Sequence, residues 1–96
     1  MSRKKIHINF SLPVSVFREG DVFVAYSPVL DLSTSGESFE LAKNRFGEVV
    51  QIFFEELIEK GTVEEVLSDM GWEKQRSQWV PPILISQETE SFNFKF

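Results

Sequence analysis

The spacing of apolar residues changes abruptly near Gly36, and this change limits the folds open to the chain. Before Gly36, apolar side chains recur at every second position, and after it they recur at every third and fourth position. Period two is typical of a strand with one buried face, whereas spacings of three and four are typical of an amphipathic helix. A sheet followed by a helix predicts an α+β domain of two layers.

Three strands are predicted before the change of period. Residues 6–17 alternate between apolar and polar side chains, residues 21–27 form a second run, and residues 30–35 form a third, shorter run. The short turn Arg18–Asp21 joins the first two runs as a hairpin. Pro13 cannot donate a ladder hydrogen bond, so it should lie at an edge, a bulge or a break. The expected sheet is a three-stranded antiparallel meander.

A long helix is predicted over residues 39–60. Ser38 is a favourable N-cap, Glu40 suits the positive end of the helix dipole, and Gly61 suits the end of the helix. The apolar stripe that should cover the sheet comprises Ala42, Phe46, Val49, Val50, Phe53 and Leu57. Gly47 costs about 1 kcal/mol relative to alanine inside a helix, so we expect it to permit close packing against a strand.

The C-terminal third is predicted to contain a short helix and an extended tail. The helix should span residues 63–70, where Thr62 and Glu65 have the spacing of a capping box. The pair Pro81–Pro82 forbids a helix and favours an extended chain. Residues 83–96 are therefore expected to form an extended tail or a strand.

Length and charge narrow the class of protein. The chain has 96 residues, a net charge of −5 and no cysteine. No repeat or linker divides residues 1–96, which we interpret as a single domain. The acidic balance argues against nucleic acid binding over the whole surface and suits a soluble protein or a basic partner. The missing cysteines favour a cytoplasmic location, and we find neither a signal-peptide core nor a membrane-spanning run.

The sequence offers no convincing catalytic, cofactor or metal site. The only histidine, His7, falls on the polar side of a predicted strand, and the three aspartates are widely spaced. The pairs Glu55–Glu56 and Glu64–Glu65 point in different directions on their helices and are interpreted as solvated surface. We therefore expect no enzyme activity, no cofactor and no metal.

Aromatic residues mark two candidate binding features near the C-terminus. Trp72 and Trp79 flank a small basic patch, which is an arrangement that can hold single-stranded nucleic acid, but packing in the core is the favoured interpretation. Phe92, Phe94 and Phe96 would share one side of a strand in the tail "SFNFKF". This strand either completes the sheet of its own domain, which is the favoured interpretation, or pairs with another chain.

The segment "FVAYSPVLDLSTSGES" and the following "FELAKNRFGEVVQIFFEELIEKG" resemble the HicB-like antitoxins, the small partners in HicA–HicB toxin–antitoxin pairs. The resemblance covers about residues 15–60. The positions that match the family motif are Val24, Tyr26, Pro28, Leu30, Asp31, Gly36, Ser38, Ala42, Phe46, Glu48, Val50, Phe53, Glu55 and Glu56. The signature residues to which we assign a structural role are Tyr26, Pro28, Leu30, Gly36, Ser38 and Ala42.

The resemblance implies a fold and a function. The family fold is a three-stranded meander, one helix across it and a further strand, similar to a reduced ribonuclease-H-like fold. Family members bind and neutralise a small basic toxin that cleaves RNA, and they have no accepted catalytic set. Many also carry a C-terminal DNA-binding domain. The pair Pro81–Pro82 and the phenylalanine tail leave no room for one, so DNA binding is not expected.

We therefore expect an antitoxin that occludes the active site of a small basic toxin by stoichiometric binding. The alternative is a stand-alone interaction or oligomerisation module without a toxin. A nuclease on this fold is disfavoured because clustered carboxylates are missing. The residues assigned to partner contact are Asp31, Glu37, Phe92, Phe94 and Phe96. We also expect a homo-oligomer, most simply a symmetric dimer.

Overall fold

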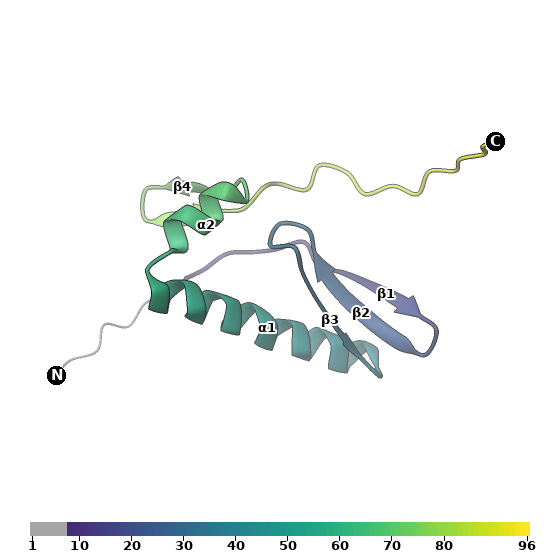
Figure 1. Ribbon diagram of the computed structural model, residues 1–96, viewed down its shortest axis with the longest axis horizontal. Helices are drawn as coiled ribbons and strands as arrows, with labels where there is room; N and C mark the ends of the chain where they lie inside the picture. The colour runs from purple at the N-terminus through teal and green to yellow at the C-terminus, as the bar shows by residue number, and fades with distance from the viewer. Residues whose placement is uncertain (1–7) are drawn as a thin grey trace.

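The structure, a computed structural model, describes residues 8–96 (Figure 1). The elements in chain order are β1 (Ser15–Glu19), β2 (Val22–Ser27), β3 (Leu32–Gly36), α1 (Phe39–Lys60), α2 (Val63–Asp69), β4 (Glu73–Gln75) and β5 (Gln78–Val80). β1, β2 and β3 form an antiparallel sheet in that order, and β4 pairs with β5 in a separate hairpin. The predicted α+β architecture, a three-stranded meander with one long helix, is confirmed.

The first strand is shorter than the sequence pattern indicated. β1 begins at Ser15, so the prediction of a strand over residues 6–17 is wrong for residues 8–14, which have no regular secondary structure. Residues 6–7 lie outside the described part of the chain. Pro13 has no N–H for a ladder, which accounts for the late start. The alternation instead reflects the burial of one side of residues 8–14. The apolar residues of this segment that pack on the core are Ile8, Phe10 and Leu12.

The third strand also begins later than predicted, at Leu32 rather than at residue 30. Residues 28–31 form the turn between β2 and β3. Asp31 has a φ of 51° in this turn, a left-handed conformation that aspartate tolerates better than most side chains. Leu30 is buried at the same turn, so its alternating position reflected burial and not strand geometry.

The long helix begins and ends at the predicted residues. The Ser38 hydroxyl accepts a hydrogen bond from the Leu41 N–H at 3.1 Å, which is the N-cap that the sequence indicated. At the other end, Gly61 adopts a left-handed φ of 66°. The Thr62 N–H then reaches back to the Leu57 carbonyl at 2.9 Å, which completes a Schellman-type ending.

The short helix α2 ends at Asp69, one residue before the predicted end. Thr62 makes no side-chain capping hydrogen bond, so the predicted capping box is wrong. Its φ of −113° and ψ of 16° differ from the extended conformation of a capping residue. The Thr62 backbone N–H bonds the Leu57 carbonyl at the end of α1, so the end of α1 sets the backbone conformation of Thr62.

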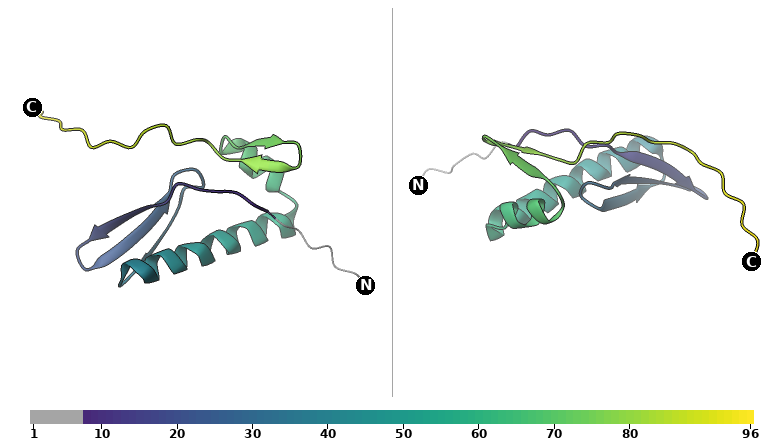
Figure 2. Two further views of the ribbon diagram at one scale, coloured as in Figure 1. Left: turned by 180° about the vertical axis from the view of Figure 1, so that it is seen from behind. Right: turned by 90° about the horizontal axis from the view of Figure 1, so that it is seen from above.

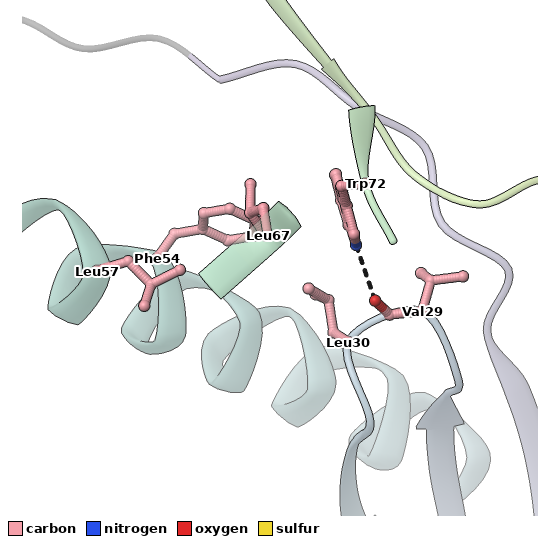
Figure 3. Close-up of a cluster of buried hydrophobic side chains, with 6 residues drawn as sticks. All are labelled: Val29, Leu30, Phe54, Leu57, Leu67 and Trp72. Carbon is pink, nitrogen blue, oxygen red and sulfur yellow. Dashed lines mark hydrogen bonds between the residues drawn. The ribbon is translucent and has the colours of Figure 1, made fainter. Parts of the chain in front are cut away.

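Two apolar clusters hold the layers together. The smaller cluster lies between α1 and the sheet and consists of Ala25, Ala42 and Phe46. The larger cluster joins the β2–β3 turn, the C-terminal half of α1 and the segment that follows it (Figure 3); its residues are Val29, Leu30, Phe54, Leu57, Leu67 and Trp72. The Trp72 indole N–H donates to the Val29 carbonyl at 2.8 Å, so one hydrogen bond links residues 43 positions apart.

The glycine that permits close packing is Gly36, not Gly47. A Cβ at Gly36 would lie 2.7 Å from the backbone nitrogen of Ala42, so the end of β3 touches the first turn of α1. A Cβ at Gly47 would meet nothing within 4 Å, which contradicts the expectation that Gly47 faces a strand. Gly47 therefore weakens the helix without any packing compensation.

Replacing Gly47 with alanine is expected to raise the free energy of unfolding by about 0.5–1 kcal/mol. Alanine loses less backbone entropy in a helix than glycine does, and the open space around position 47 accepts the extra methyl group. Urea denaturation followed by circular dichroism measures the change. A destabilised Gly47→Ala variant would contradict the open surroundings of this position.

The C-terminal strand is not where the tail pattern placed it. No strand forms within residues 81–96; the strands near the C-terminus are β4 and β5, which precede Pro81. The tail leaves β5 and runs out past the sheet, so that the C-terminus lies far from the helices (Figures 1 and 2). The favoured expectation that the tail completes the sheet of its own chain is therefore wrong.

Candidate functional site

The described residues do not gather a group of side chains that could hold a metal ion. Within residues 8–96, no three histidine, cysteine, aspartate or glutamate side chains lie close enough to hold a metal ion. His7 lies outside the described residues. None of the helices described is both long enough and apolar enough to cross a membrane. The other candidate features that the sequence indicated are surfaces that a partner could contact.

The two tryptophans do not form a stacking platform for nucleic acid. Trp72 is 3% exposed and packs on Phe10 and Phe54, with ring centroids 5.4 Å and 6.3 Å away. Trp79 is half-buried and packs against the same cluster, as expected. The Lys74 ammonium lies 5.9 Å from the centroid of the Trp79 ring, opposite it in the β4–β5 hairpin. These contacts hold the C-terminal hairpin in place.

Asp31 and Glu37, two residues assigned to partner contact, lie at opposite ends of β3. Both are exposed, and six residues of extended chain place them roughly 20 Å apart. The Asp31 carboxylate accepts a hydrogen bond from the Tyr26 hydroxyl at 3.2 Å, which ties the β2–β3 turn to β2. Glu37 precedes the capping residue of α1. The structure therefore does not bring these two carboxylates, or the tail, into one site.

Tyr26 is the residue of this region whose pKa is shifted. Partial burial raises the pKa of its phenol above 10.0, and the hydrogen bond to Asp31 and the negative charge of that carboxylate raise it further. The folded protein therefore favours the protonated phenol. The protonated Tyr26 phenol therefore contributes to the stability of the fold. This contribution is fully present below the pKa of the phenol in the unfolded chain, and it is lost as the pH rises through the higher pKa of the folded state.

Spectrophotometric titration of Tyr26 should show a midpoint above pH 10.0 in the folded protein. Tyr26 is the single tyrosine of the sequence, so tyrosinate absorbance reports on it alone. In an Asp31→Asn variant the midpoint should fall toward the ordinary value, because the negative charge is removed while the burial remains. An equal midpoint in both proteins would contradict the role of Asp31.

An acidic helical surface is the main electrostatic feature of the chain. We define it by the exposed residues Glu48, Glu55, Glu56, Glu59, Glu64, Glu65 and Asp69. Residues 48–69 contain these seven acidic side chains and one basic one, Lys60, for a net charge of −6. The rest of the chain has eight acidic and nine basic side chains, for a net charge of +1. The whole negative balance of the protein therefore lies on α1 and α2.

Ile52 lies in the middle of the α1 part of this surface. It is 59% exposed, although it belongs to a helix whose other face is buried in both clusters. On a helix, residues three, four and seven positions apart share a face. By this rule four glutamates lie next to Ile52, namely Glu48, Glu55, Glu56 and Glu59, together with Val49 and Arg45 on the N-terminal side. Lys60 partly offsets one of them, since its Nζ lies 3.9 Å from Glu56 Oε1.

This arrangement was missed from the sequence because Ile52 was not part of the apolar stripe and the glutamates were interpreted as pairs. The signal was present: an apolar residue with four glutamates at helical spacing, outside the stripe that contains Ala42 and Phe46. An exposed apolar side chain within a charged rim is the usual composition of a protein-binding patch.

The tail residues Phe92, Phe94 and Phe96 are exposed, as a partner-binding role requires. They lie on a segment with no regular structure that extends away from both helices (Figure 2). Two surfaces, the acidic helical surface and the tail, are therefore available for binding. No protein-family model, curated protein or solved structure matches the chain, so these surfaces themselves carry the functional proposal.

Proposed function

We propose that the protein is an inhibitor of the antitoxin type, which binds a small basic RNA-cleaving toxin through the acidic helical surface. The observation that carries the proposal is the exposed Ile52, which four glutamates flank on α1. The isoleucine supplies apolar area at the centre, and the glutamates supply charge complementary to a basic protein. Three of them, Glu48, Glu55 and Glu56, also stand at motif positions of the HicB-like resemblance.

The mechanism on this proposal is steric and electrostatic. A basic toxin is attracted to the surface that holds the negative charge of the chain, which accelerates encounter at low salt. Once bound, the protein covers the catalytic groups of the toxin and excludes RNA, whose phosphates compete for the same basic side chains. No chemical step by the antitoxin is required.

The test begins with the product of the small gene adjacent to the gene for this chain. The two proteins are co-expressed with a tag on one of them, and the purified complex is assayed for suppression of RNA cleavage. A stable complex that inhibits cleavage supports the proposal. The proposal fails if the neighbouring protein does not bind.

A charge-reversal variant then locates the surface. The double variant Glu55→Lys/Glu59→Lys should weaken binding by roughly 100-fold or more, because two exposed charges next to Ile52 change sign. The pair keeps like charges at positions i and i+4, so the helix itself is little affected. The matched control is Glu88→Lys/Glu90→Lys, which makes the same change in net charge on the tail. Equal loss of binding in both variants would contradict the assignment to α1.

A second candidate function is a stand-alone oligomeric module without a toxin. The observation that favours it is the exposed apolar tail, which a monomer leaves uncovered. Purification of the chain with no co-expressed partner distinguishes the two functions. Self-association together with failure to bind the neighbouring protein supports the module, whereas self-association alone is compatible with an antitoxin.

A further inference from the structure

The tail has the side-chain pattern of a strand but no sheet of its own. Phe92 is 73% exposed and Phe94 is 69% exposed. The Phe92 and Phe94 rings stack with centroids 5.9 Å apart and planes 7° apart, and the Phe96 ring follows 5.9 Å further on. Rings at alternate residues share one side only when the backbone is extended. The opposite side carries the polar residues Ser91, Asn93 and Lys95.

The sheet has one open edge that suits such a strand. β1 pairs with β2 on one side, and no strand of the described chain pairs with its other side. The far edge, β3, is less accessible because its last residue, Gly36, touches α1 at Ala42. In addition, the Ser35 carbonyl accepts a hydrogen bond from Arg45 at 3.0 Å. An unpaired edge strand presents a row of free backbone N–H and C=O groups to any extended segment.

The sheet face beside this edge is partly apolar, and neither helix of the described chain covers it. α1 packs on the face that carries Phe23 and Ala25. The opposite face, which we call the outer face, carries Phe17 opposite Val24, with Val22 and Tyr26 on the same side of β2. Phe17 is 54% exposed. A strand added beside β1 with its phenylalanines on the outer face would extend this apolar row by one strand.

The tail and the open edge belong to the same chain but do not meet within it. The tail passes residues 9–13 at its start, where Ile83 and Leu84 share a groove with them, and then runs away from the sheet. The radius of gyration is 16.6 Å, compared with about 12.5 Å for a compact chain of this length. The 14 residues of the tail span up to roughly 46 Å when extended, which is enough to reach a neighbouring molecule.

We propose that two copies of the chain exchange their tails, so that residues 92–96 of each copy add a fourth strand to the β1 edge of the other. Each copy has one donor strand and one acceptor edge, so reciprocal exchange closes a dimer with twofold symmetry. The second copy is favoured as the occupant because donor and acceptor are then always present in equal numbers. The five residues of the donor match the five residues of β1. This surface is separate from the acidic helical surface.

The test measures the mass of the full-length protein by light scattering and sedimentation over a range of concentrations. We expect a dimer. The variant Phe92→Ser/Phe94→Ser/Phe96→Ser should weaken dimerisation by about 100-fold or more, since three apolar anchors are lost. The matched control, Asn93→Ser/Lys95→Ser, changes the polar side of the same strand and should dimerise as the original protein does. All of these side chains are exposed, so circular dichroism should show unchanged folding.

A mixing experiment separates tail-to-edge exchange from packing of tail on tail. The variant Phe17→Lys places a charge on the outer face beside β1 and should be monomeric. Mixed with the triple-serine tail variant, it should form a heterodimer, because one partner retains the tail and the other retains the acceptor edge. Amide hydrogen exchange should show that the backbone N–H groups of residues 15–19 that point away from β2 are protected in the dimer and lose protection in the tail variant.

Several outcomes would overturn the proposal. One is a monomer at all concentrations, including a monomer in which the tail protects β1 of its own chain. Others are a dimer that survives the tail variant, or a mixture that forms no heterodimer. The Glu55→Lys/Glu59→Lys variant, whose changes lie on α1 and not on the tail or on β1, should still dimerise, so failure of the tail exchange and failure of the antitoxin function are distinguishable results.

Discussion

Replacing Trp72 with alanine is expected to lower the free energy of unfolding by about 3–5 kcal/mol. Trp72 is almost fully buried and packs on Phe10 and Phe54, and its indole bonds the Val29 carbonyl at 2.8 Å. A domain of this length has a total stability of about 5–14 kcal/mol. The Trp72→Ala variant should therefore be close to unfolding, as measured by urea denaturation.

Two further variants separate the contributions of packing and hydrogen bonding. Trp72→Phe keeps most of the aromatic packing and removes the donor to Val29, which should cost about 1–3 kcal/mol. Trp79→Ala is the matched control. Because Trp79 is only half-buried, this substitution should lower the free energy of unfolding by less than Trp72→Ala does. Equal losses for the two alanine variants would contradict the central position of Trp72.

Replacing Gly36 with alanine should destabilise the protein by roughly 1–3 kcal/mol, or more if the helix cannot shift. The added Cβ would lie 2.7 Å from Ala42 N and 3.0 Å from Leu41 C. Both atoms belong to the backbone of α1, so relief requires movement of the whole helix relative to β3. Thermal and urea denaturation give the magnitude.

Gly47→Ala is the matched control. Gly47 lies on the open side of α1, so the same glycine-to-alanine substitution should stabilise the protein there. The two variants are therefore expected to have opposite signs. A neutral or stabilised Gly36→Ala variant would show that β3 and α1 do not approach as closely as described. Gly36 is also a signature position of the HicB-like resemblance, and its contact with Ala42 gives a physical reason for a glycine there.

The sequence predicted the long helix well because its signals were local and consistent. The N-cap at Ser38, the C-terminal Gly61 and the apolar stripe all acted within one segment. The first strand was predicted poorly because alternation reports which side of a segment is buried. Whether that segment also pairs depends on its neighbours, and residues 8–14 pack on the core without pairing.

The β4–β5 hairpin shows a second limit of sequence patterns. Its turn places Arg76 at a φ of 60°, a conformation that asparagine or glycine usually supplies in a two-residue turn. Without those residues the turn gave no signal. The hairpin is instead held by tertiary contacts, in which Trp79 packs against the larger cluster. Propensity within the segment could not have predicted it.

The candidate site was only partly predictable. The alternation of the tail phenylalanines indicated that they share one side of an extended segment. Whether that side meets the sheet of its own chain depends on the path taken after Pro81–Pro82, and the favoured expectation that it does was wrong. The setting of Ile52 needed knowledge of which helix face is buried, and the structure supplies it through Phe46, Phe54 and Leu57. The concentration of negative charge in residues 48–69 can be counted in the sequence, whereas the exposure of Ile52 among these residues required the structure.

The hydrogen bond between Trp72 and Val29 has a consequence for the order of folding. It joins residues 43 positions apart, so the larger cluster closes only after the hairpin β2–β3 and the helix α1 have approached each other. Contacts of such long sequence separation slow folding, because the intervening chain must lose entropy before they form. Docking of the indole should thus belong to the rate-limiting step of refolding and not to an early, local one. Stopped-flow fluorescence of Trp72, with Trp79 replaced by phenylalanine, would follow that step directly.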